Sequence, residues 1–125
     1  MQPNNSSIMN PYEELVSFIL PKEIHNSFEV KKTEVKIEKS EPVMYIYLDE
    51  YDKPPKADVE LFPNGFYEPS MITDFPIRDH KVVLVVRRRR WKDADGKSYS
   101  NDNNLVAKGT RFSNEFAAFL KELYR

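Results

Sequence analysis

The fold is decided by the segment Val82-Val83-Leu84-Val85-Val86-Arg87-Arg88-Arg89-Arg90-Trp91, which carries the strongest strand signal in the chain. Its five consecutive apolar residues are too continuous for a surface strand and predict burial on both faces. Four arginines follow immediately. We therefore expect one strand over Val82–Trp91 that leaves the core at Arg87 and carries guanidinium groups outward on both faces.

Extended segments are also expected upstream of this strand. Residues 71–77 form the nearest one, and a tight turn at residues 78–81 joins the two. Earlier in the chain, apolar and charged residues alternate in two stretches that meet near Ser40, which predicts a β-hairpin. The apolar positions of this hairpin are Phe28, Val30, Val35 and Ile37 in the first strand, and Val43, Tyr45 and Tyr47 in the second.

Helices are expected towards both ends. Asn10 and Pro11 are typical of a helix start, and Pro21 should end this helix because the residue before a proline is pushed out of the α region. A further helical turn is expected over residues 23–26. Ser113 should cap a final helix. The apolar stripe of that helix consists of Phe116, Phe119, Leu120 and Leu123.

Together these elements predict an α+β fold, in which a small antiparallel sheet of about four to five strands is flanked by an N-terminal and a C-terminal helix. The 125 residues are about one domain long, so we expect a single domain over residues 1–125. Residues 1–10 should be a flexible start. Residues 51–70 are rich in proline and should form a long irregular loop, whereas Tyr99 should lie on a short strand.

The composition excludes several classes of protein. No cysteine is present, which removes disulfides, thiolate metal sites and cysteine nucleophiles. No apolar run of about 18 residues could span a membrane, and the first ten residues lack the pattern of a secretory signal, so a cytoplasmic location is expected. The three glycines are scattered, whereas a phosphate-binding loop needs them clustered.

Patterns typical of catalysis are missing as well. The two histidines, His25 and His80, have no second ligand at a metal-binding spacing. Asp93 and Asp95 resemble the start of a calcium-binding loop, but the other ligands are absent and a plain turn at Gly96 is expected. We therefore expect a protein that is not an enzyme and that holds no metal or cofactor.

Charge is distributed unevenly along the chain. Residues 1–77 contain 7 Lys and Arg against 14 Asp and Glu, a net charge of −7, whereas residues 78–125 contain 12 against 6, a net charge of +6. This asymmetry favours a nucleic-acid surface on one side of the molecule, although a mixed-charge surface can also fluctuate without any function.

The arginine run is the candidate contact surface. Residues Arg87, Arg88, Arg89 and Arg90 are spaced by about 3.3 Å along an extended chain and could reach successive phosphates. Trp91 could stack on a base or on a guanidinium group. The alternative is that Trp91 packs in the core and the arginines form a solvated edge that prevents aggregation. The basic patch could extend to Lys92, Lys97, Lys108 and Arg111.

Five segments occur in a fixed order: Asp74-Phe75-Pro76-Ile77-Arg78, then Val82–Trp91, Asn104-Leu105-Val106-Ala107, Gly109-Thr110-Arg111-Phe112 and Glu115-Phe116-Ala117-Ala118-Phe119-Leu120. This ordered set resembles the N-terminal region of ISAon-type insertion-sequence transposases. The likeness is good from about Phe66 to Leu123. The family is in turn similar to the beginning of the larger ISL group of DDE transposases, in which an arginine-ended strand precedes a zinc knuckle.

The resemblance implies a DNA-binding or accessory subunit of a transposition system, with Arg87–Arg90, Trp91 and Arg111 as contacts to element-end DNA. The knuckle cysteines would fall around residues 91–100, where this chain has none, so zinc is not carried over and packing with the Asp95-Gly96 turn should replace it. The DDE carboxylates of such transposases lie in a downstream nuclease domain and are expected on a separate polypeptide.

Three hypotheses follow from these observations. The first is a non-catalytic subunit that binds element-end DNA through the arginine strand. The second is a protein-interaction module whose acidic part docks on a separately encoded, basic DDE transposase. The third is an inactive transposase remnant that keeps the fold without the activity.

Overall fold

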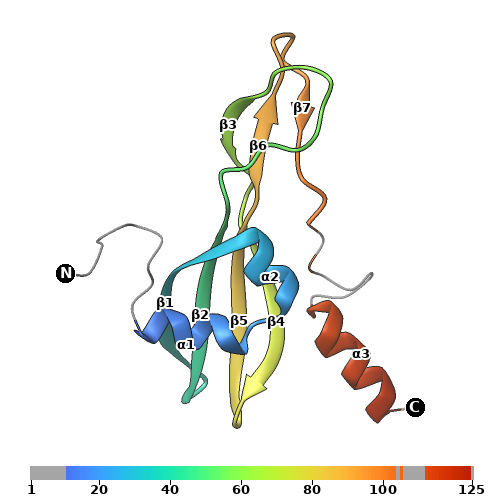
Figure 1. The fold of residues 1–125 in the computed structure, drawn as a ribbon. Helices are drawn as coiled ribbons and strands as arrows, with labels where there is room; N and C mark the ends of the chain where they lie inside the picture. Colours follow the sequence, from blue (N-terminus) through green and yellow to red (C-terminus); the bar gives the residue numbers. More distant parts are fainter. Residues whose placement is uncertain (1–10, 104, 106–111, 125) are drawn as a thin grey trace, which may run out of the picture.

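The computed structural model describes residues 11–103, 105 and 112–124 (Figure 1). The mixed content of helices and strands confirms the predicted α+β class. The predicted flexible start over residues 1–10 lies outside the described residues. In chain order the elements are α1 (Pro11–Ile19), α2 (Lys22–Ser27), β1 (Phe28–Glu38), β2 (Glu41–Glu50), β3 (Phe62–Phe66), β4 (Ser70–Ile77), β5 (His80–Arg87), β6 (Arg89–Lys92), β7 (Ser98–Tyr99) and α3 (Asn114–Leu123).

Four strands form the main sheet, in the order β1-β2-β5-β4. Two antiparallel hairpins, β1–β2 and β4–β5, lie side by side, and β2 and β5 pair in parallel at the centre. The expected all-antiparallel sheet is therefore wrong at this pair. The chain leaves β2 and enters β4 at the same end of the sheet, so the β4–β5 turn sends β5 back in the direction of β2 (Figure 1).

The main core lies between this sheet and helices α1 and α2 (Figure 1). Leu48 and Leu84 of the two central strands are completely buried. Val83 and Val85 point to the opposite face, where they join a smaller cluster with Val43 and Tyr45. Residues 82–86 are thus buried on both faces, as the sequence predicted. The main core contains Leu20, Ile24, Phe28, Ile46, Leu48, Ile72, Val82, Leu84, Val86 and Leu105.

The segment Val82–Trp91 is not one strand, which corrects the prediction. β5 ends at Arg87, and β6 begins at Arg89 in a second sheet of order β3-β6-β7. Between them, the Arg88 carbonyl accepts a hydrogen bond from the Tyr67 N–H at 2.8 Å, outside either ladder. The chain changes partner strands here, and an apolar-to-charged switch in the sequence cannot show such a change.

The second sheet belongs to an arm, which we define as residues 51–69 and 88–101, that projects beyond the main sheet (Figure 1). The predicted loop over residues 51–70 is irregular only in part, because β3 lies within it. Pro63 is tolerated there because β3 is an edge strand, where a missing N–H costs no ladder bond. The short strand predicted at Tyr99 is confirmed as β7.

Helix α3 begins as predicted. The Ser113 hydroxyl accepts a hydrogen bond from the Phe116 N–H at 3.3 Å and donates one to Asp74 at 2.7 Å, which fixes the helix start against β4. The Phe75 ring lies 5.1 Å from the ring of Phe116, centroid to centroid. The predicted apolar stripe is only partly covered, since Leu123 remains 60% exposed.

The β1–β2 turn generates a prediction on stability. Ser40 has φ = +66°, a left-handed conformation that costs a non-glycine residue roughly 1 kcal/mol. Ser40→Gly should therefore raise the free energy of unfolding by about 1 kcal/mol, measured by urea denaturation. Ser70→Gly in β4 is the matched control and should lower it by about 0.5–1 kcal/mol. A loss of stability in Ser40→Gly would contradict this account.

Candidate nucleic-acid interface

Arg87 is held by a carboxylate of the neighbouring strand. Its Nε and Nη2 atoms each donate to one oxygen of Asp49, both at 2.7 Å, which is a bidentate ion pair. The parallel register places the two residues directly opposite each other. The hydrogen bond with Asp49, which is 8% exposed, raises the pKa of Arg87 above its ordinary value. The charge of Arg87 is therefore neutralised within the fold.

Arg89 is held by the next acidic residue, Glu50. The Arg89 backbone N–H donates to a Glu50 carboxylate oxygen at 2.7 Å, and its Nε donates to the Glu50 carbonyl at 2.8 Å. The second carboxylate oxygen accepts from the side-chain amide of Asn103. Glu50 is only 2% exposed, so these donors supply the partners that a buried carboxylate requires. We call the contacts of Asp49 and Glu50 with Arg87 and Arg89 the junction.

Two aromatic rings divide the arginines into two pairs. Phe66 lies between Arg87 and Arg89, whose guanidinium carbons are 4.0 and 4.7 Å from its ring centroid. Tyr67 lies near Arg88 and Arg90, at 5.7 and 5.4 Å. Successive side chains of an extended chain point to opposite faces, so the odd and even arginines meet different rings. Both pairs fall within the range of cation–π attraction.

Arg88 and Arg90 have no carboxylate partner among the described residues. Arg88 donates through Nη2 to the Asn101 carbonyl at 2.6 Å, a neutral acceptor that leaves its charge uncompensated. The Nε atoms of both arginines are shielded from water and have no hydrogen-bond acceptor in the described part of the chain. This pair, with Tyr67 between its guanidinium groups, is what we call the Tyr67 face.

The structure therefore corrects the expectation of an open ridge of four arginines. Arg87 and Arg89 serve the junction: Arg87 is paired with the Asp49 carboxylate, and the side chain of Arg89 donates to the Glu50 carbonyl. The other two arginines make no contact with the junction. Trp91 is 3% exposed and pairs with Pro63 and Tyr99, so it packs inside the arm and is not available for stacking on a base.

Of the other basic residues predicted as contacts, two are exposed and two lie outside the described residues. Lys92 at the end of β6 and Lys97 in the following turn are exposed, as a contact requires. Lys108 and Arg111 lie outside the described residues. The structure thus brings Arg88, Arg90 and the two lysines together on one arm.

The tip of the arm is built on Asp93. One of its carboxylate oxygens accepts from the backbone N–H groups of Asp95 and Lys97, both at 2.9 Å, and the other accepts from the Tyr99 hydroxyl at 3.1 Å. The Lys97 hydrogen bond is the main cause that lowers the pKa of Asp93 below its ordinary value of 3.8. Gly96 has φ = +85°, which closes the predicted turn without strain. Hydrogen bonds thus shape the tip.

Sequence reasoning missed the partners of the arginines. Asp49 and Glu50 stand at the end of a predicted strand, and two adjacent carboxylates there are a signal that they are paired. The parallel register of β2 and β5 decides which basic residues these carboxylates contact, and local sequence patterns do not predict that register. Phe66 and Tyr67 lie in a segment that the sequence predicts to be a loop, so no contact with the arginines was predicted for them.

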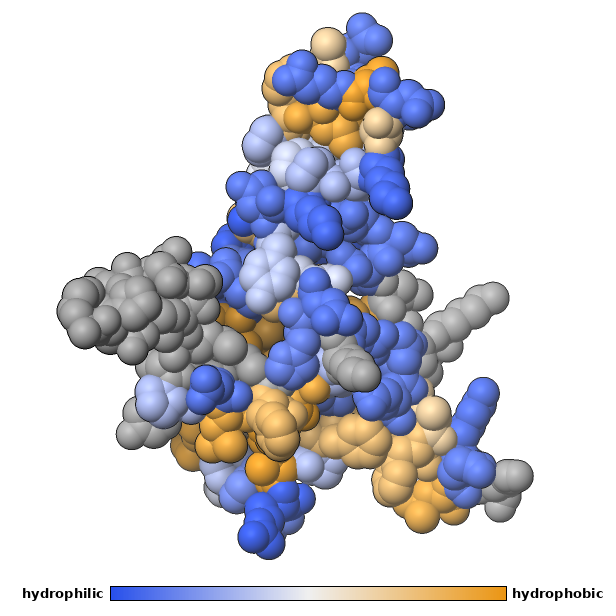
Figure 2. Space-filling view, in the orientation of Figure 1, coloured by the Kyte–Doolittle hydropathy of each residue, from blue (hydrophilic) through white to orange (hydrophobic). Residues whose placement is uncertain are grey.

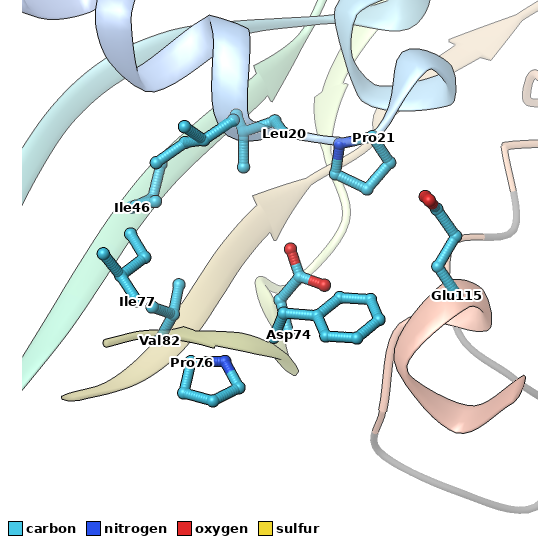
Figure 3. Close-up of a pocket in the computed structure, with 10 residues that line it drawn as sticks. Leu20, Pro21, Ile46, Asp74, Pro76, Ile77, Val82 and Glu115 are labelled. Carbon is cyan, nitrogen blue, oxygen red and sulfur yellow. The ribbon is translucent and has the colours of Figure 1, made fainter. Parts of the chain in front are cut away.

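A cleft of about 360 Å³ opens on the helix-covered face of the main sheet (Figure 3). Its walls come from the α1–α2 connection, the end of β4 and the start of α3. Burial is the main cause that raises the pKa of nearby Glu23, with contributions from Glu115 and Asp74. The lining residues are Ile19, Leu20, Pro21, Ile46, Asp74, Phe75, Pro76, Ile77, Val82 and Glu115. The surface around the helices is correspondingly apolar (Figure 2).

Within the described residues, no three His, Asp or Glu side chains cluster so as to hold a metal ion. None of the helices in that part of the chain is long and apolar enough to cross a membrane. No family model matches the chain, and neither the curated proteins nor the solved structures contain a significant match.

The junction can be tested by a double-mutant cycle. Asp49→Asn and Arg87→Gln should each destabilise the protein, and the coupling energy from the cycle should be about 1–2 kcal/mol. This is below the roughly 3–5 kcal/mol lost on breaking a fully buried pair, because 44% of the Arg87 side chain is exposed and therefore screened. The measurement is urea denaturation of the four proteins, and a coupling near zero would contradict a structural ion pair.

The tip should respond to acid. The pKa of Asp93 is lowered on folding, mainly by the hydrogen bond from Lys97. The stability that the ionised Asp93 gives to the folded tip is therefore complete above the ordinary pKa and is lost as the pH falls through the lower folded value. Hydrogen exchange of the Lys97 amide should therefore accelerate, relative to other amides, as the pH falls below 3.8. Asp93→Asn should remove this acid dependence, because an amide does not titrate there. An identical pH profile in both proteins would exclude Asp93 as the cause.

Proposed function

We propose that the protein is a non-catalytic DNA-binding subunit of an insertion-sequence transposition system, which contacts DNA phosphates through its arm. The observation that carries the proposal is the Tyr67 face, where Arg88 and Arg90 keep charges that no described carboxylate neutralises. The assignment to a transposition system rests on the ordered motifs that resemble the N-terminal regions of ISAon-type transposases.

Arginine donors without acceptors favour an anionic ligand. A guanidinium group presents a planar fork of donors that matches phosphate oxygens, and a guanidinium group that no carboxylate neutralises keeps its charge for such a ligand. Arg88 and Arg90 already contact Tyr67, so part of the ordering of their side chains has taken place before binding. Arg87 and Arg89 are not proposed as contacts, because the junction uses them.

The spacing of basic residues along the arm also suits duplex DNA. Alternate residues on one face of an extended strand lie about 6.6 Å apart, a spacing at which Arg90 and Lys92 of β6 could contact neighbouring phosphates. The arm as a whole carries seven basic and six acidic residues, so its net charge is only +1 and a long-range field contributes little. Binding would depend on local contacts by Arg88, Arg90 and Lys92.

Catalysis would come from another polypeptide in this proposal. The DDE carboxylates of the related transposases would reside on a separately encoded protein, and the present chain would position element ends for it. Such a subunit would act in the cytoplasm, where the element DNA is found.

A second candidate function is supported by the cleft. Its apolar walls, with the carboxylates of Asp74 and Glu115 in the lining and that of Glu23 nearby, would suit a partner segment that combines apolar side chains with a basic one. This is the docking module for a basic DDE transposase that the sequence raised as an alternative. Co-purification with the transposase that survives nuclease treatment would favour it over direct DNA binding.

DNA binding is tested by fluorescence anisotropy on a labelled duplex that contains an element end. Three phosphate contacts predict a salt slope of about −2.7, which weakens binding about 40-fold between 50 and 200 mM salt. The double variant R88A/R90A should lose two of these contacts, so its slope should fall to about −0.9.

The matched control is R78A/K81A, which removes the same charge at the far end of the main sheet. It should bind as the parent protein does. The proposal fails if the parent does not bind at low salt, or if the two double variants weaken binding equally.

A further inference from the structure

The outer edge of β1 has no partner strand in the described part of the chain. β1 is eleven residues long and lies at one side of the main sheet (Figure 1). The opposite edge is different, because Thr73 of β4 forms a bridge with Phe112 and its carbonyl accepts from the Ser113 N–H at 2.9 Å. A long free edge is a template for pairing with another strand.

The hairpin turn determines which backbone groups reach this edge. Lys39 and Ser40 both have positive φ, and the pair Glu38–Glu41 closes the two-residue turn. The closing pair of such a turn is hydrogen-bonded, and pairs alternate along the hairpin. The backbone N–H and C=O groups of residues 33, 35 and 37 therefore point away from β2, towards the free edge.

The side chains of β1 also form an unusual edge pattern. Val35 and Ile37 lie on the helix-covered face and are 58% and 69% exposed. On the other face, residues of alternating charge occupy the even positions. These are Lys32, Glu34, Lys36 and Glu38. Charged residues usually protect an edge strand, but an exposed apolar pair beside them does not.

We propose that β1 pairs antiparallel with β1 of a second copy of this chain, about a two-fold axis at Val35, so that the two main sheets join into one. In this register Val35 is opposite Val35 of the second copy and Thr33 is opposite Ile37, which uses the outward-pointing backbone groups. On the other face Lys32 is opposite Glu38 and Glu34 is opposite Lys36. Symmetry doubles each pair, so the seam has four pairs of opposite charge.

The charges on β1 favour this register over the registers with the two-fold axis at a nearby residue. An axis at Glu34 would place like charges opposite one another at Glu34 itself and at Lys32 with Lys36. An axis at Lys36 would do the same at Lys36 and at Glu34 with Glu38. An axis at Thr33 would keep only the Lys32 and Glu34 pairs. The axis at Val35 therefore has the most complementary seam.

The charged side chains of β1 have contacts within the chain as well. The ammonium groups of Lys32 and Lys36 lie 4.5 and 4.6 Å from the ring centroids of Tyr47 and Tyr45. Glu34 accepts from the Tyr47 hydroxyl at 2.8 Å, and a carboxylate has further acceptor sites for a cross-strand lysine.

The dimer does not depend on the proposed DNA binding and is tested without DNA. Sedimentation velocity over a concentration series should show a reversible dimer that weakens as salt is added. Glu34→Lys replaces two attractive pairs by repulsive ones and should raise the dimer dissociation constant roughly tenfold or more. Lys36→Glu should have the same effect.

Complementation makes the test specific. The E34K variant carries lysine at both positions 34 and 36, whereas the K36E variant carries glutamate at both. In an equimolar mixture each contact between positions 34 and 36 joins opposite charges, so a heterodimer should form from two proteins that are separately monomeric. The double variant E34K/K36E should likewise regain the homodimer. The control is Glu60→Lys in the arm, which makes the same charge change on an exposed residue and should leave dimerisation unchanged.

Three results would overturn the inference: a parent protein that is monomeric at every concentration, single variants that dimerise as the parent does, or variants that fold but do not recover on mixing. Circular dichroism of each variant establishes that it is folded. Loss of DNA binding alone would not bear on the dimer, and loss of the dimer alone would leave the contacts of the arm in place.

Discussion

The contact of two carboxylates with two arginines at the junction is what the rest of the structure depends on. β2 and β5 end side by side because they are parallel, so Asp49 and Glu50 meet Arg87 and Arg89 at the point where the chain leaves the main sheet. Without these partners, consecutive guanidinium charges would repel one another where the second sheet begins. The ion pair with Asp49 compensates the charge of Arg87, and the hydrogen bonds from Arg89 to Glu50 help to fix the arm to the sheet.

The alternation of an extended chain divides the arginine run into two pairs with different tasks. One pair faces Phe66 and the junction carboxylates, while the other faces Tyr67 and lacks a charged partner among the described residues. A run of identical residues therefore does not act as a uniform patch. Neighbouring arginines differ in role because successive side chains point to opposite faces and meet different surroundings.

Folding brings the acidic and the basic parts of the chain into contact. The acidic part supplies β1 and β2, and the basic part supplies β5 and β6, so the central parallel pair brings the two together. Part of the asymmetry is neutralised at this contact and contributes to folding. Arg88 and Arg90 on the Tyr67 face keep their charge, because no described carboxylate pairs with them.

The α+β class, the hairpin around Ser40, the burial of residues 82–86 and the cap at Ser113 were determined by the sequence alone, because periodicity, turn chemistry and capping act over a few residues. Tertiary structure alone decided that β2 and β5 are parallel, that the strand breaks at Arg88 and that Arg87 is neutralised by Asp49. These features depend on which strands become neighbours, and that choice depends on contacts between segments about 40 residues apart in sequence, which local patterns do not encode.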